Sequence, residues 1–481
     1  MRRFRLPLRS GLALAAASLV GAALTAPGNA QAQDAFVPGA AGVGDSYFPG
    51  DGNGGYDVQN YDLAVRYDPL PGHLAGVATI SARATQNLAR FNLDLVGLNV
   101  RKVTVDGAAA RFARTGQELE ITPAAGLTKG RTFTVVVTYA GIPDPTLSGT
   151  EARGFHRTLT GAVFTGQPHV ATTWFPVNDH PTDRATYTVE VDVPAGLTAV
   201  SNGVLAEQRS AAGRTVWTWR ADDPMASYLV VLAVGDLELT AYTKDGIRYW
   251  DAVDRILGPN FARDALAQQS TVIATLAEMF GPYPYDIGGA IVHAAAAEFA
   301  LETQTRPVYA PKFFAPGGSG VGVVVHELAH QWFGDNVRLA DWRNIWVNEG
   351  FASYAQWLYT ERTGGQSAAK RFAETWEAYA DDLEFWSVRI GDPGAENLFN
   401  GAVYVRGAMT LHQLRQVVGD STFFRILRSW ATKRAGDAVT ISEFVAHAEK
   451  VSGRDLGRFF DTWLFTGSRP TLPGPGGPAP S

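Results

Sequence analysis

The sequence predicts an α+β, multidomain fold, in which an N-terminal antiparallel β-saddle or sandwich precedes a mainly helical domain. Three observations predict it. In residues 56–242, β-branched and aromatic residues alternate with polar ones, which is typical of half-buried strands. In residues 243–466, apolar residues recur at helical spacing. The 51 glycines and 26 prolines of this 481-residue chain supply the many turns that a β-rich domain needs.

The first segment, residues 1–32, has the pattern of an export signal. A head of four arginines precedes an uncharged apolar run at 11–26, and Ala30-Gln31-Ala32 provides a small-residue cleavage site. The run is shorter than the roughly 20 residues of a membrane span, although an uncleaved anchor is the alternative interpretation. We therefore expect a secreted or periplasmic protein whose mature form does not span a membrane. The sequence leaves open whether the general or the twin-arginine route is used.

The β-domain follows a Gly-rich lead-in at residues 33–55, which we expect to be loose. Its strands are short and are separated by Gly, Asp, Asn and Pro, so that neighbouring strands can return through tight turns. They are expected at 61–68, 76–85, 131–141, 185–193 and 214–221.

The second domain begins at residue 243, where the apolar spacing becomes helical, and several of its helical segments end in Gly, a common helix stop. Helices are expected within 262–280, 320–334, 348–365, 369–386, 402–419 and 441–453. The tail at 467–481 is rich in Pro and Gly and is expected to be disordered.

Composition excludes several classes of function. The formal net charge of −6 gives no bulk attraction to nucleic acid, so we expect no nucleic-acid partner. The chain contains no cysteine, which excludes disulfides, a Cys nucleophile and Cys-ligated metals. Any bound metal must therefore be held by His, Asp or Glu.

The segment His326-Glu327-Leu328-Ala329-His330 has the spacing of a metal site. On a helix, positions four apart lie on one face, so His326 and His330 can direct two imidazoles at one ion. Glu327 lies beside them and can reach a water on that ion. The alternative interpretation is a pair of histidines in a polar patch of the helix.

A third ligand follows 19 residues after His330, where Glu349 opens the next predicted helix. Two histidines and one glutamate leave the fourth position of a tetrahedral zinc open for water, as in catalytic sites. The spacing therefore predicts one Zn²⁺ per chain, bound by His326, His330 and Glu349.

These strings resemble a known family. HELAHQWFGDNV (326–337) followed by WVNEGFASY (346–354) resembles the gluzincin aminopeptidases of the aminopeptidase N family. The resemblance covers most of residues 45–465 and implies a β-saddle domain followed by a thermolysin-like catalytic domain. Larger members add a helical C-terminal domain, which this chain is expected to lack.

The resemblance also implies a residue that binds the substrate's free α-amine. Relatives carry it as the Glu of a Gly-x-Met-Glu-Asn motif, and the matching stretch here, FALETQTRPVY, places Glu302 there. Glu298 competes for the same alignment. A carboxylate in this place would pair with the ammonium that only the first residue of a peptide carries. The alternative is a structural ion pair between Glu302 and Arg306.

A Tyr-x-Lys-Gly motif of the family resembles Tyr404-Val405-Arg406-Gly407, with Arg406 in place of Lys. A phenol hydroxyl aimed at the scissile carbonyl can stabilise the oxyanion of a tetrahedral intermediate. The resemblance thus assigns Tyr404 to catalysis. The alternative is a core tyrosine near the start of a helix.

The resemblance also extends to three positions in expected loops, Gln167, His169 and Asn344. The resemblance places Gln167, or the residue two beyond it, near the substrate amine, where His169 departs from the usual Glu, Gln or Asn. His169 and His180 are equally consistent with surface loops. Asn344 stands where many relatives have Asp, and is expected to weaken a contact to a metal-binding histidine.

Together these features predict a zinc aminopeptidase that acts on peptides with a free N-terminus, with Glu327 as general base, Tyr404 on the oxyanion, and Glu302 and Gln167 on the amine. Two alternatives stay open: a thermolysin-type endopeptidase, and a zinc-containing module that binds peptides without cleaving them. We expect a monomer.

Overall fold

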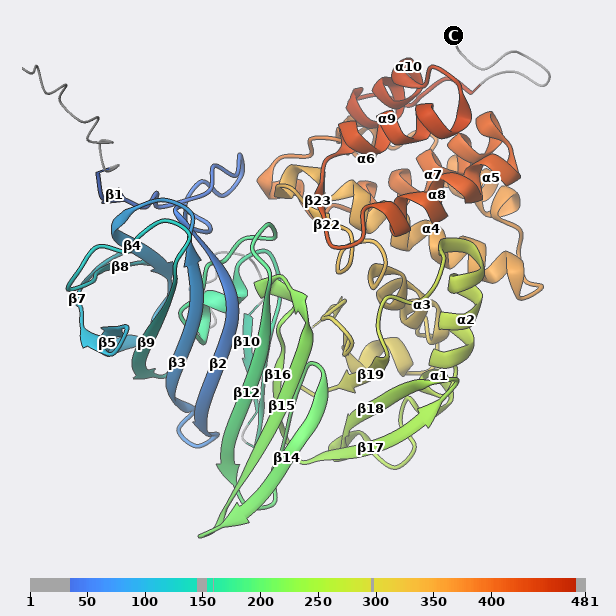
Figure 1. Ribbon diagram of the computed structural model, residues 1–481. Coiled ribbons are helices and arrows are strands. Elements are labelled where there is room, and N and C mark those ends of the chain that lie inside the picture. Colours follow the sequence, from blue (N-terminus) through green and yellow to red (C-terminus); the bar gives the residue numbers. More distant parts are fainter. Residues whose placement is uncertain (1–34, 145–153, 159, 296–297, 473–481) are drawn as a thin grey trace, which may run out of the picture. The chain divides into compact units, whose positions relative to one another are not determined.

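The structure is a computed structural model that describes residues 35–144, 154–158, 160–295 and 298–472 (Figure 1). The expected signal peptide and residues 473–481 of the tail lie outside these ranges. The described residues from Phe36 onwards group into one unit by their contacts. The α+β class is confirmed: strands precede a domain in which helices predominate.

An eight-stranded sheet forms the centre of the N-terminal domain. Its order is β14-β15-β12-β2-β3-β9-β5-β6, and neighbours are antiparallel except β12 and β2, which run parallel. The strands are β2 (Tyr56–Asp68), β3 (His73–Ala84), β5 (Asn99–Val105), β6 (Ala108–Ala109), β9 (Thr132–Gly141), β12 (Ala185–Pro194), β14 (Val204–Ala211) and β15 (Arg214–Met225).

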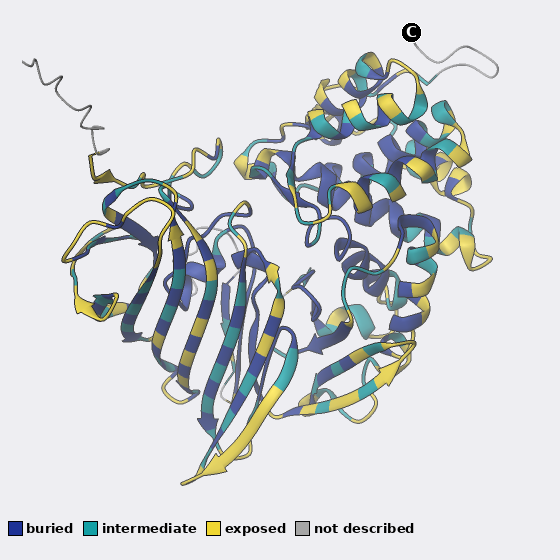
Figure 2. Cartoon of the chain, in the orientation of Figure 1, coloured by how far each residue is buried: buried dark blue, intermediate teal, exposed yellow. Residues whose placement is uncertain are grey.

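The alternation of apolar and polar residues along the strands determines which face of this sheet packs on the core. In β2, Tyr61, Leu63 and Val65 are buried whereas the residues between them are exposed. Figure 2 shows the same banding along the long strands. Because neighbouring side chains of a strand point to opposite faces, this alternation fixes which face packs inward.

Two four-stranded sheets complete the N-terminal domain. The first has the order β1-β4-β8-β7 and the second β10-β11-β16-β13. Their strands are β1 (Val37–Pro38), β4 (Leu88–Asp94), β7 (Arg111–Thr115), β8 (Glu118–Thr122), β10 (Gly154–Arg157), β11 (Ala162–Thr165), β13 (Thr198–Ser201) and β16 (Leu232–Gly235).

The second domain opens with a mixed sheet that the helical pattern did not predict. Its order is β17-β18-β19-β21-β20, formed by β17 (Leu237–Lys244), β18 (Ile247–Asp254), β19 (Ile287–Val292), β20 (Ala300–Leu301) and β21 (Val308–Tyr309). The expected boundary after residue 242 falls inside β17, whose partner β18 belongs to this second sheet.

Helices make up the rest of this domain. They are α1 (Arg263–Leu266), α2 (Gln269–Phe280), α3 (Val321–His330), α4 (Trp346–Arg362), α5 (Ala368–Ala378), α6 (Leu383–Ser387), α7 (Gly401–Val418), α8 (Asp420–Lys433), α9 (Ile441–Ser452) and α10 (Gly457–Phe460). Of the longer ones, only α8 was not predicted. Helix α4 packs against both α3 and α7, and the short strands β22 (Arg338–Leu339) and β23 (Ala438–Val439) pair beside them.

The 3-10 turns are η2 (Val170–Thr173), η3 (Ser227–Leu229), η4 (Arg255–Leu257), η5 (Pro311–Phe314), η6 (Trp342–Asn344) and η7 (Ala395–Asn397), and a π-helical turn, η8, spans Asp461–Phe465. None of the described helices is both long enough and apolar enough to cross a membrane.

The lead-in differs from the expectation of a loose segment. Asp45, Asp51 and Asn53 are all buried, and the carboxylate of Asp45 accepts a hydrogen bond of 2.9 Å from the backbone N–H of Trp342 in η6. A buried carboxylate with a backbone donor holds a segment in place despite its glycines. The tail likewise begins ordered, because the guanidinium of Arg469 lies 4.2 Å from the ring of Trp376.

Candidate metal centre

Helix α3 presents the two histidines. Its buried residues Val324, Val325 and Leu328 pack into the core, and α4 crosses it closely. His326 and His330 lie one turn apart, with ring centroids separated by 4.9 Å. The rigid helix therefore sets the spacing of the two imidazoles, as the sequence predicted.

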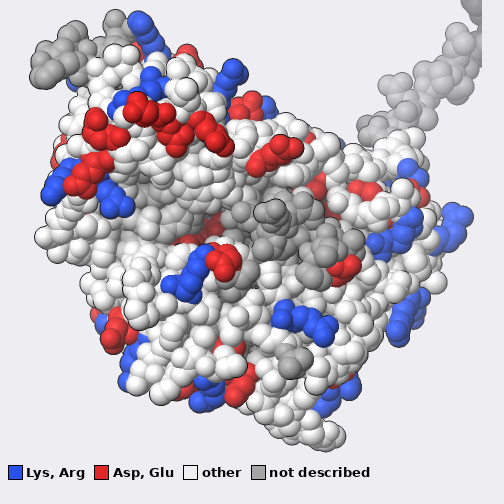
Figure 3. Space-filling view, turned by 180° about the vertical axis from the view of Figure 1, so that it is seen from behind, with Lys and Arg blue, Asp and Glu red and all other residues white. Residues whose placement is uncertain are grey.

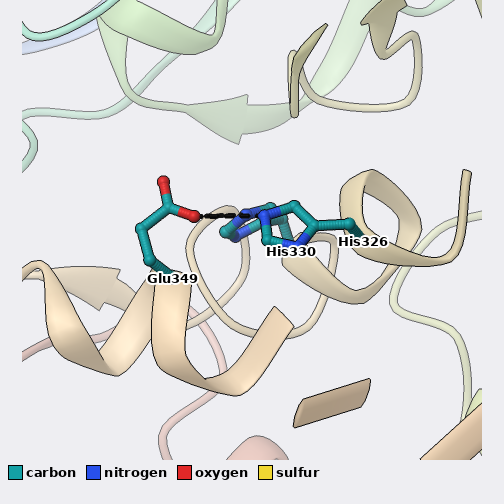
Figure 4. Close-up of side chains that lie close together, drawn as sticks. All are labelled: His326, His330 and Glu349. Carbon is teal, nitrogen blue, oxygen red and sulfur yellow. Dashed lines mark hydrogen bonds and ion pairs between the residues drawn. The ribbon is translucent and has the colours of Figure 1, made fainter. Parts of the chain in front are cut away.

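Helix α4 brings the third group. Glu349 lies in its first turn, and its Oε2 atom is 3.1 Å from Nε2 of His326 and 3.4 Å from Nε2 of His330 (Figure 4). Donors around a tetrahedral zinc, at about 2.0–2.2 Å from the ion, lie about 3.3 Å apart. These two separations, with the ligand atoms of all three residues within 4.8 Å of one another, fit the donor set of one zinc ion.

The other ring nitrogens are held by partners that the sequence analysis missed. Nδ1 of His330 lies 3.0 Å from the carbonyl of Phe333, and Nδ1 of His326 lies 3.3 Å from Oε1 of Gln356. The amide of Gln356 in turn donates to the carbonyl of Gly322 at 2.8 Å. Such partners leave Nε2 free to bind a metal. The signal for Gln356 is its place seven residues after Glu349, on the same face of α4.

Burial and charge set the protonation of the ligands. Burial lowers the pKa of His326, which favours the neutral imidazole that a metal ion requires. Burial alone would raise the pKa of Glu349, but His330 and His326 together lower it to about 2. Glu349 is therefore ionised across the ordinary range of pH.

A second acidic group adjoins the ligands on the side of His330. Ligand atoms of Glu302, Glu327 and His330 all lie within 4.8 Å of one another. Burial raises the pKa of Glu327 well above its usual value, with the charges of Glu302 and Glu349 adding to the effect against the opposing pull of His330. A divalent cation between these groups favours the ionised forms of both carboxyls.

Glu302 is a buried carboxyl that lacks a protein partner on one oxygen. Only 2% of the residue is exposed, and among the described residues nothing hydrogen-bonds to its Oε1 atom. Burial raises the pKa of Glu302 to about 7; His330 counteracts this rise and Glu349 adds to it. An ammonium group placed beside it would favour its ionised form.

The sequence left two alternatives open: Glu298 in place of Glu302, and an ion pair between Glu302 and Arg306. Glu298 lies at the surface, 2.7 Å from Nζ of Lys312. Arg306 does not pair with Glu302: its guanidinium donates to the carbonyls of Trp250 and Gly203. The structural ion pair between Glu302 and Arg306 is therefore wrong, because backbone carbonyls already occupy this arginine.

Gln331 fixes the loop that carries Glu302. Its side chain donates to the carbonyl of Glu302 at 3.1 Å and accepts from the N–H of Thr305 at 2.8 Å. Asn202, from the N-terminal domain, also donates to the carbonyl of Gln304 at 2.8 Å. The loop is thus tied both to the end of α3 and to the β-domain. The sequence analysis missed Gln331, although it directly follows a predicted ligand.

Helix α7 places Tyr404 beside His326. Its ring stacks on that of His326, with centroids 5.9 Å apart and an interplanar angle of 25°. Arg406, which replaces the Lys of the motif, is fully buried and donates to the carbonyls of Trp386, Val388 and Trp463. It thus anchors α7 and does not face the centre with a free charge.

In the β-domain, Gln167 follows β11 and is buried, and its Oε1 atom has no hydrogen-bond partner among the described residues. His169 lies 2.9 Å from Asp51, and His180 is 2% exposed with Nε2 3.2 Å from Asp45. The interpretation as a surface loop residue is therefore wrong for His180, which is buried against Asp45, whereas the side chain of His169 is 20% exposed and only partly covered by Asp51.

Asn344 does not contact either histidine of the centre. Its Oδ1 atom accepts from the N–H of Ile441 at the start of α9, and its Nδ2 atom donates to Asp341 at 2.8 Å. The expectation of a weakened contact to a metal-binding histidine is wrong, because the partners at those nitrogens are Phe333 and Gln356. Asn344 instead joins η6 to α9.

The charges on the surface are mixed. On the face shown in Figure 3, acidic side chains lie at the floor of a hollow, and Lys and Arg side chains are distributed over the surface around it. An acidic hollow favours cationic groups over anionic ones.

Two family models match the chain. The model of the Peptidase M1 N-terminal domain matches residues 58–229, and that of the Peptidase family M1 domain matches residues 317–463. The second match contains the two histidines, Glu327 and Glu349.

Curated relatives match over most of the chain. Aminopeptidase N of Streptomyces lividans is 26% identical over 454 residues, which cover 85% of this chain and 50% of that protein. Leukotriene A-4 hydrolase of Xenopus laevis is 26% identical over 421 residues, with 81% of this chain and 67% of that protein covered. The chain thus spans about half the length of the first of these curated relatives.

Solved structures match at nearly full length. The M1 zinc metallopeptidase of Deinococcus radiodurans is 31% identical, with 91% of this chain and 100% of that chain covered and a TM-score of 0.82. A mutant of that protein bound to a Tyr-Ser-Ala substrate matches with a TM-score of 0.81, 31% identity, and 90% and 98% coverage.

Proposed function

Because this chain belongs to the M1 family of zinc metallopeptidases, the family of aminopeptidase N, we propose that it is a zinc-dependent aminopeptidase that removes N-terminal residues from peptides. The observation that carries the proposal is the buried, unpaired oxygen of Glu302 beside the metal-binding residues. It provides a place for the ammonium group of a substrate.

Each residue of the centre has a role in amide hydrolysis. His326, His330 and Glu349 would hold a zinc ion, which would supply a Lewis acid that lowers the pKa of water towards 7 and polarises the scissile carbonyl. Glu327 takes a proton from the attacking water and later gives it to the leaving amine. Its buried position favours this exchange, since burial makes its carboxyl a stronger base.

Tyr404 stabilises the negative charge that develops on the carbonyl oxygen. Its ring is stacked on His326 and is therefore held in one orientation relative to the centre. A pre-oriented hydroxyl donor is worth more in the transition state than in the ground state.

Glu302 and Gln167 select the bond that is cleaved. An ammonium that pairs with Glu302 and donates to the free Oε1 of Gln167 places the first peptide bond at the centre. The peptide-bound structure of the Deinococcus relative supports a peptide substrate for this chain as well.

The test uses purified protein whose zinc content has been measured. It is offered aminoacyl anilides with a free amine and their N-acetylated counterparts. Cleavage of the free-amine forms alone, lost with a chelator and restored by zinc, is the expected result. Cleavage of internal bonds in blocked peptides would instead establish an endopeptidase, and zinc binding without any hydrolysis would establish a binding module.

We also propose that the chain is exported and acts as a monomer. The arginine head, apolar run and cleavage site at residues 1–32 support export. Fractionation of cells, followed by N-terminal sequencing of the protein, is expected to find it outside the cytoplasm and beginning at residue 33. Light scattering of the purified protein tests the monomer.

A further inference from the structure

A cavity of about 430 Å³ joins the metal centre to helix α5. At one end it is lined by His326 and Tyr404, and at the other by Arg371, Glu374 and Thr375 of α5. Between them the wall is formed by α4 and α7, through Ser353, Gln356, Val405 and Ala408. The cavity therefore lies where a substrate that leaves the centre on the side of His326 would extend.

Arg371 and Glu374 are both exposed and both line this cavity, but the two side chains do not pair with each other. Among the described residues, no hydrogen bond, ion pair or ring contact engages the guanidinium of Arg371. The neighbouring acid, Glu374, is already occupied, since it accepts from Gln366 at 2.6 Å and lies 3.9 Å from Nζ of Lys370. A second, adjoining cavity is also lined by Arg371, together with Gln356 and Trp357.

The two sides of the centre differ in the charges that they carry. Glu302 and Glu327 cluster with His330, whereas the cavity at His326 contains the guanidinium of Arg371, together with Glu374, whose carboxylate is held by Gln366 and Lys370. A peptide whose ammonium is held at Glu302 therefore directs its leaving group towards Tyr404 and the cavity. A short peptide would then place its C-terminal carboxylate near the guanidinium of Arg371. A guanidinium can pair with a carboxylate through two parallel hydrogen bonds.

We propose that Arg371 binds the C-terminal carboxylate of short peptides and makes the enzyme selective for peptides with a free C-terminus. This inference rests on the proposed function, because it takes the substrate's amine to lie at Glu302. Arg371 is thus a specificity-determining residue and takes no part in the chemical step.

The experiment compares peptides that differ only at the C-terminus. Leu-Gly, Leu-Gly-Gly and Leu-Gly-Gly-Gly are supplied as free acids and as amides, and kcat and KM are measured for each. Leucine anilide, which has no carboxylate, reports the basal activity. For at least one length, kcat/KM of the acid is expected to exceed that of the amide by about three- to tenfold, mainly through KM.

Two variants of Arg371 test whether this side chain causes the preference for the free acid over the amide. In Arg371→Gln the ratio of acid to amide is expected to fall to about one, whereas Arg371→Lys retains part of it. Lys370→Gln is the matched control, because Lys370 carries the same charge on the neighbouring position of α5 and lines neither cavity. Its ratio is expected to equal that of the unmodified protein.

Each result decides the proposal. A ratio near one at every length, or a ratio that persists in Arg371→Gln, would overturn it. A ratio that falls equally in Lys370→Gln would also overturn it, since the effect would then be one of net charge. Because the ratio is taken within one protein sample, a variant that folds poorly still gives an answer. If leucine anilide itself is not cleaved, the proposed function fails, whereas cleavage of the anilide with a ratio of one overturns Arg371 alone.

Discussion

Two glutamates of the centre carry the same carboxyl group, and we assign them different roles because their neighbours differ. Glu327 lies on α3 next to His326, with a carboxylate oxygen within 4.8 Å of a ring nitrogen of His330, where it would reach a water bound to a metal ion. Glu302 lies on a loop, with one oxygen that no described residue engages. Position relative to the candidate metal ligands, rather than chemical type, thus separates the proposed general base from the proposed amine-binding group.

Glu327→Gln tests the general base. The amide keeps the shape of the side chain and cannot take a proton, so we expect zinc content to be unchanged and kcat to fall by about a thousandfold or more. The measurements are zinc analysis and anilide hydrolysis on the same sample. Unchanged turnover would remove Glu327 from the mechanism.

Glu302→Gln tests the amine site. An ammonium pairs much more strongly with a carboxylate than with an amide, so kcat/KM for free-amine anilides is expected to fall by about 100-fold. Stability should not fall, because the substitution removes a buried acid that the protein itself leaves partly unpaired. Glu298→Gln, at the surface, is the control and should behave as the unmodified protein. Equal losses in the two variants would argue against a specific amine site.

At the scale of elements, the sequence predicted best those features whose residues all lie within one helix or one strand. Helix α3 holds both histidines at a spacing that the helix itself fixes, so their arrangement could be read without a structure. The strands of the large sheet were likewise visible in their alternation. Strand β19 was not, because all six of its residues are buried and no alternation is left.

What could not be predicted are the contacts that join elements distant in the chain. Gln331 reaches the loop at 302–305, and Gln356 reaches His326 from another helix. The place of β17 in the second sheet depends on its pairing with β18, which no local pattern reveals. Such contacts depend on how elements that are distant in the chain pack together, and this packing cannot be inferred from a single sequence.

Gln331→Ala tests whether the Glu302 loop must be held. Losing two buried hydrogen bonds is expected to cost about 1–3 kcal/mol of stability and to raise KM for free-amine anilides about tenfold, with a smaller effect on kcat. Urea unfolding and steady-state kinetics provide the two readouts. Gln268→Ala, at an exposed position before α2, is the control. A loss of stability without a rise in KM would show that Gln331 is only structural.

At the scale of the whole molecule, one carboxylate links three parts of the chain. Asp45 of the lead-in accepts hydrogen bonds from the N–H groups of Tyr47 and Phe48, lies 3.2 Å from Nε2 of His180 in the β-domain, and accepts from the N–H of Trp342 in the catalytic domain. Its side chain is fully buried. The lead-in therefore acts as a strap between the two domains, which explains why a Gly-rich segment is ordered.

This strap gives the stability of the protein a defined dependence on pH. Burial would raise the pKa of Asp45, but the hydrogen bonds from His180 and from the backbone of Trp342, Phe48 and Tyr47 outweigh it and lower the pKa from 3.8 to about 2. A carboxyl with a lowered pKa stabilises the folded state above its unfolded pKa, and this contribution is lost as the pH falls through its folded pKa. The shift corresponds to about 2 kcal/mol at pH 7.

Asp45→Asn should therefore reduce stability by about 2 kcal/mol at every pH from 8 down to about 4, and the difference from the unmodified protein should shrink between about pH 4 and pH 2. Urea unfolding at a series of pH values measures it, with Asp222→Asn, an exposed residue of β15, as the control. If the difference in free energy of unfolding between the two proteins grew on acidification, Asp45 would not stabilise the fold as an ionised carboxylate. Trp342 lies within the segment that joins His330 to Glu349, the candidate zinc ligands. We therefore expect the variant also to lose zinc to a chelator faster at neutral pH, where the strap is weakened but the three candidate ligands are unchanged.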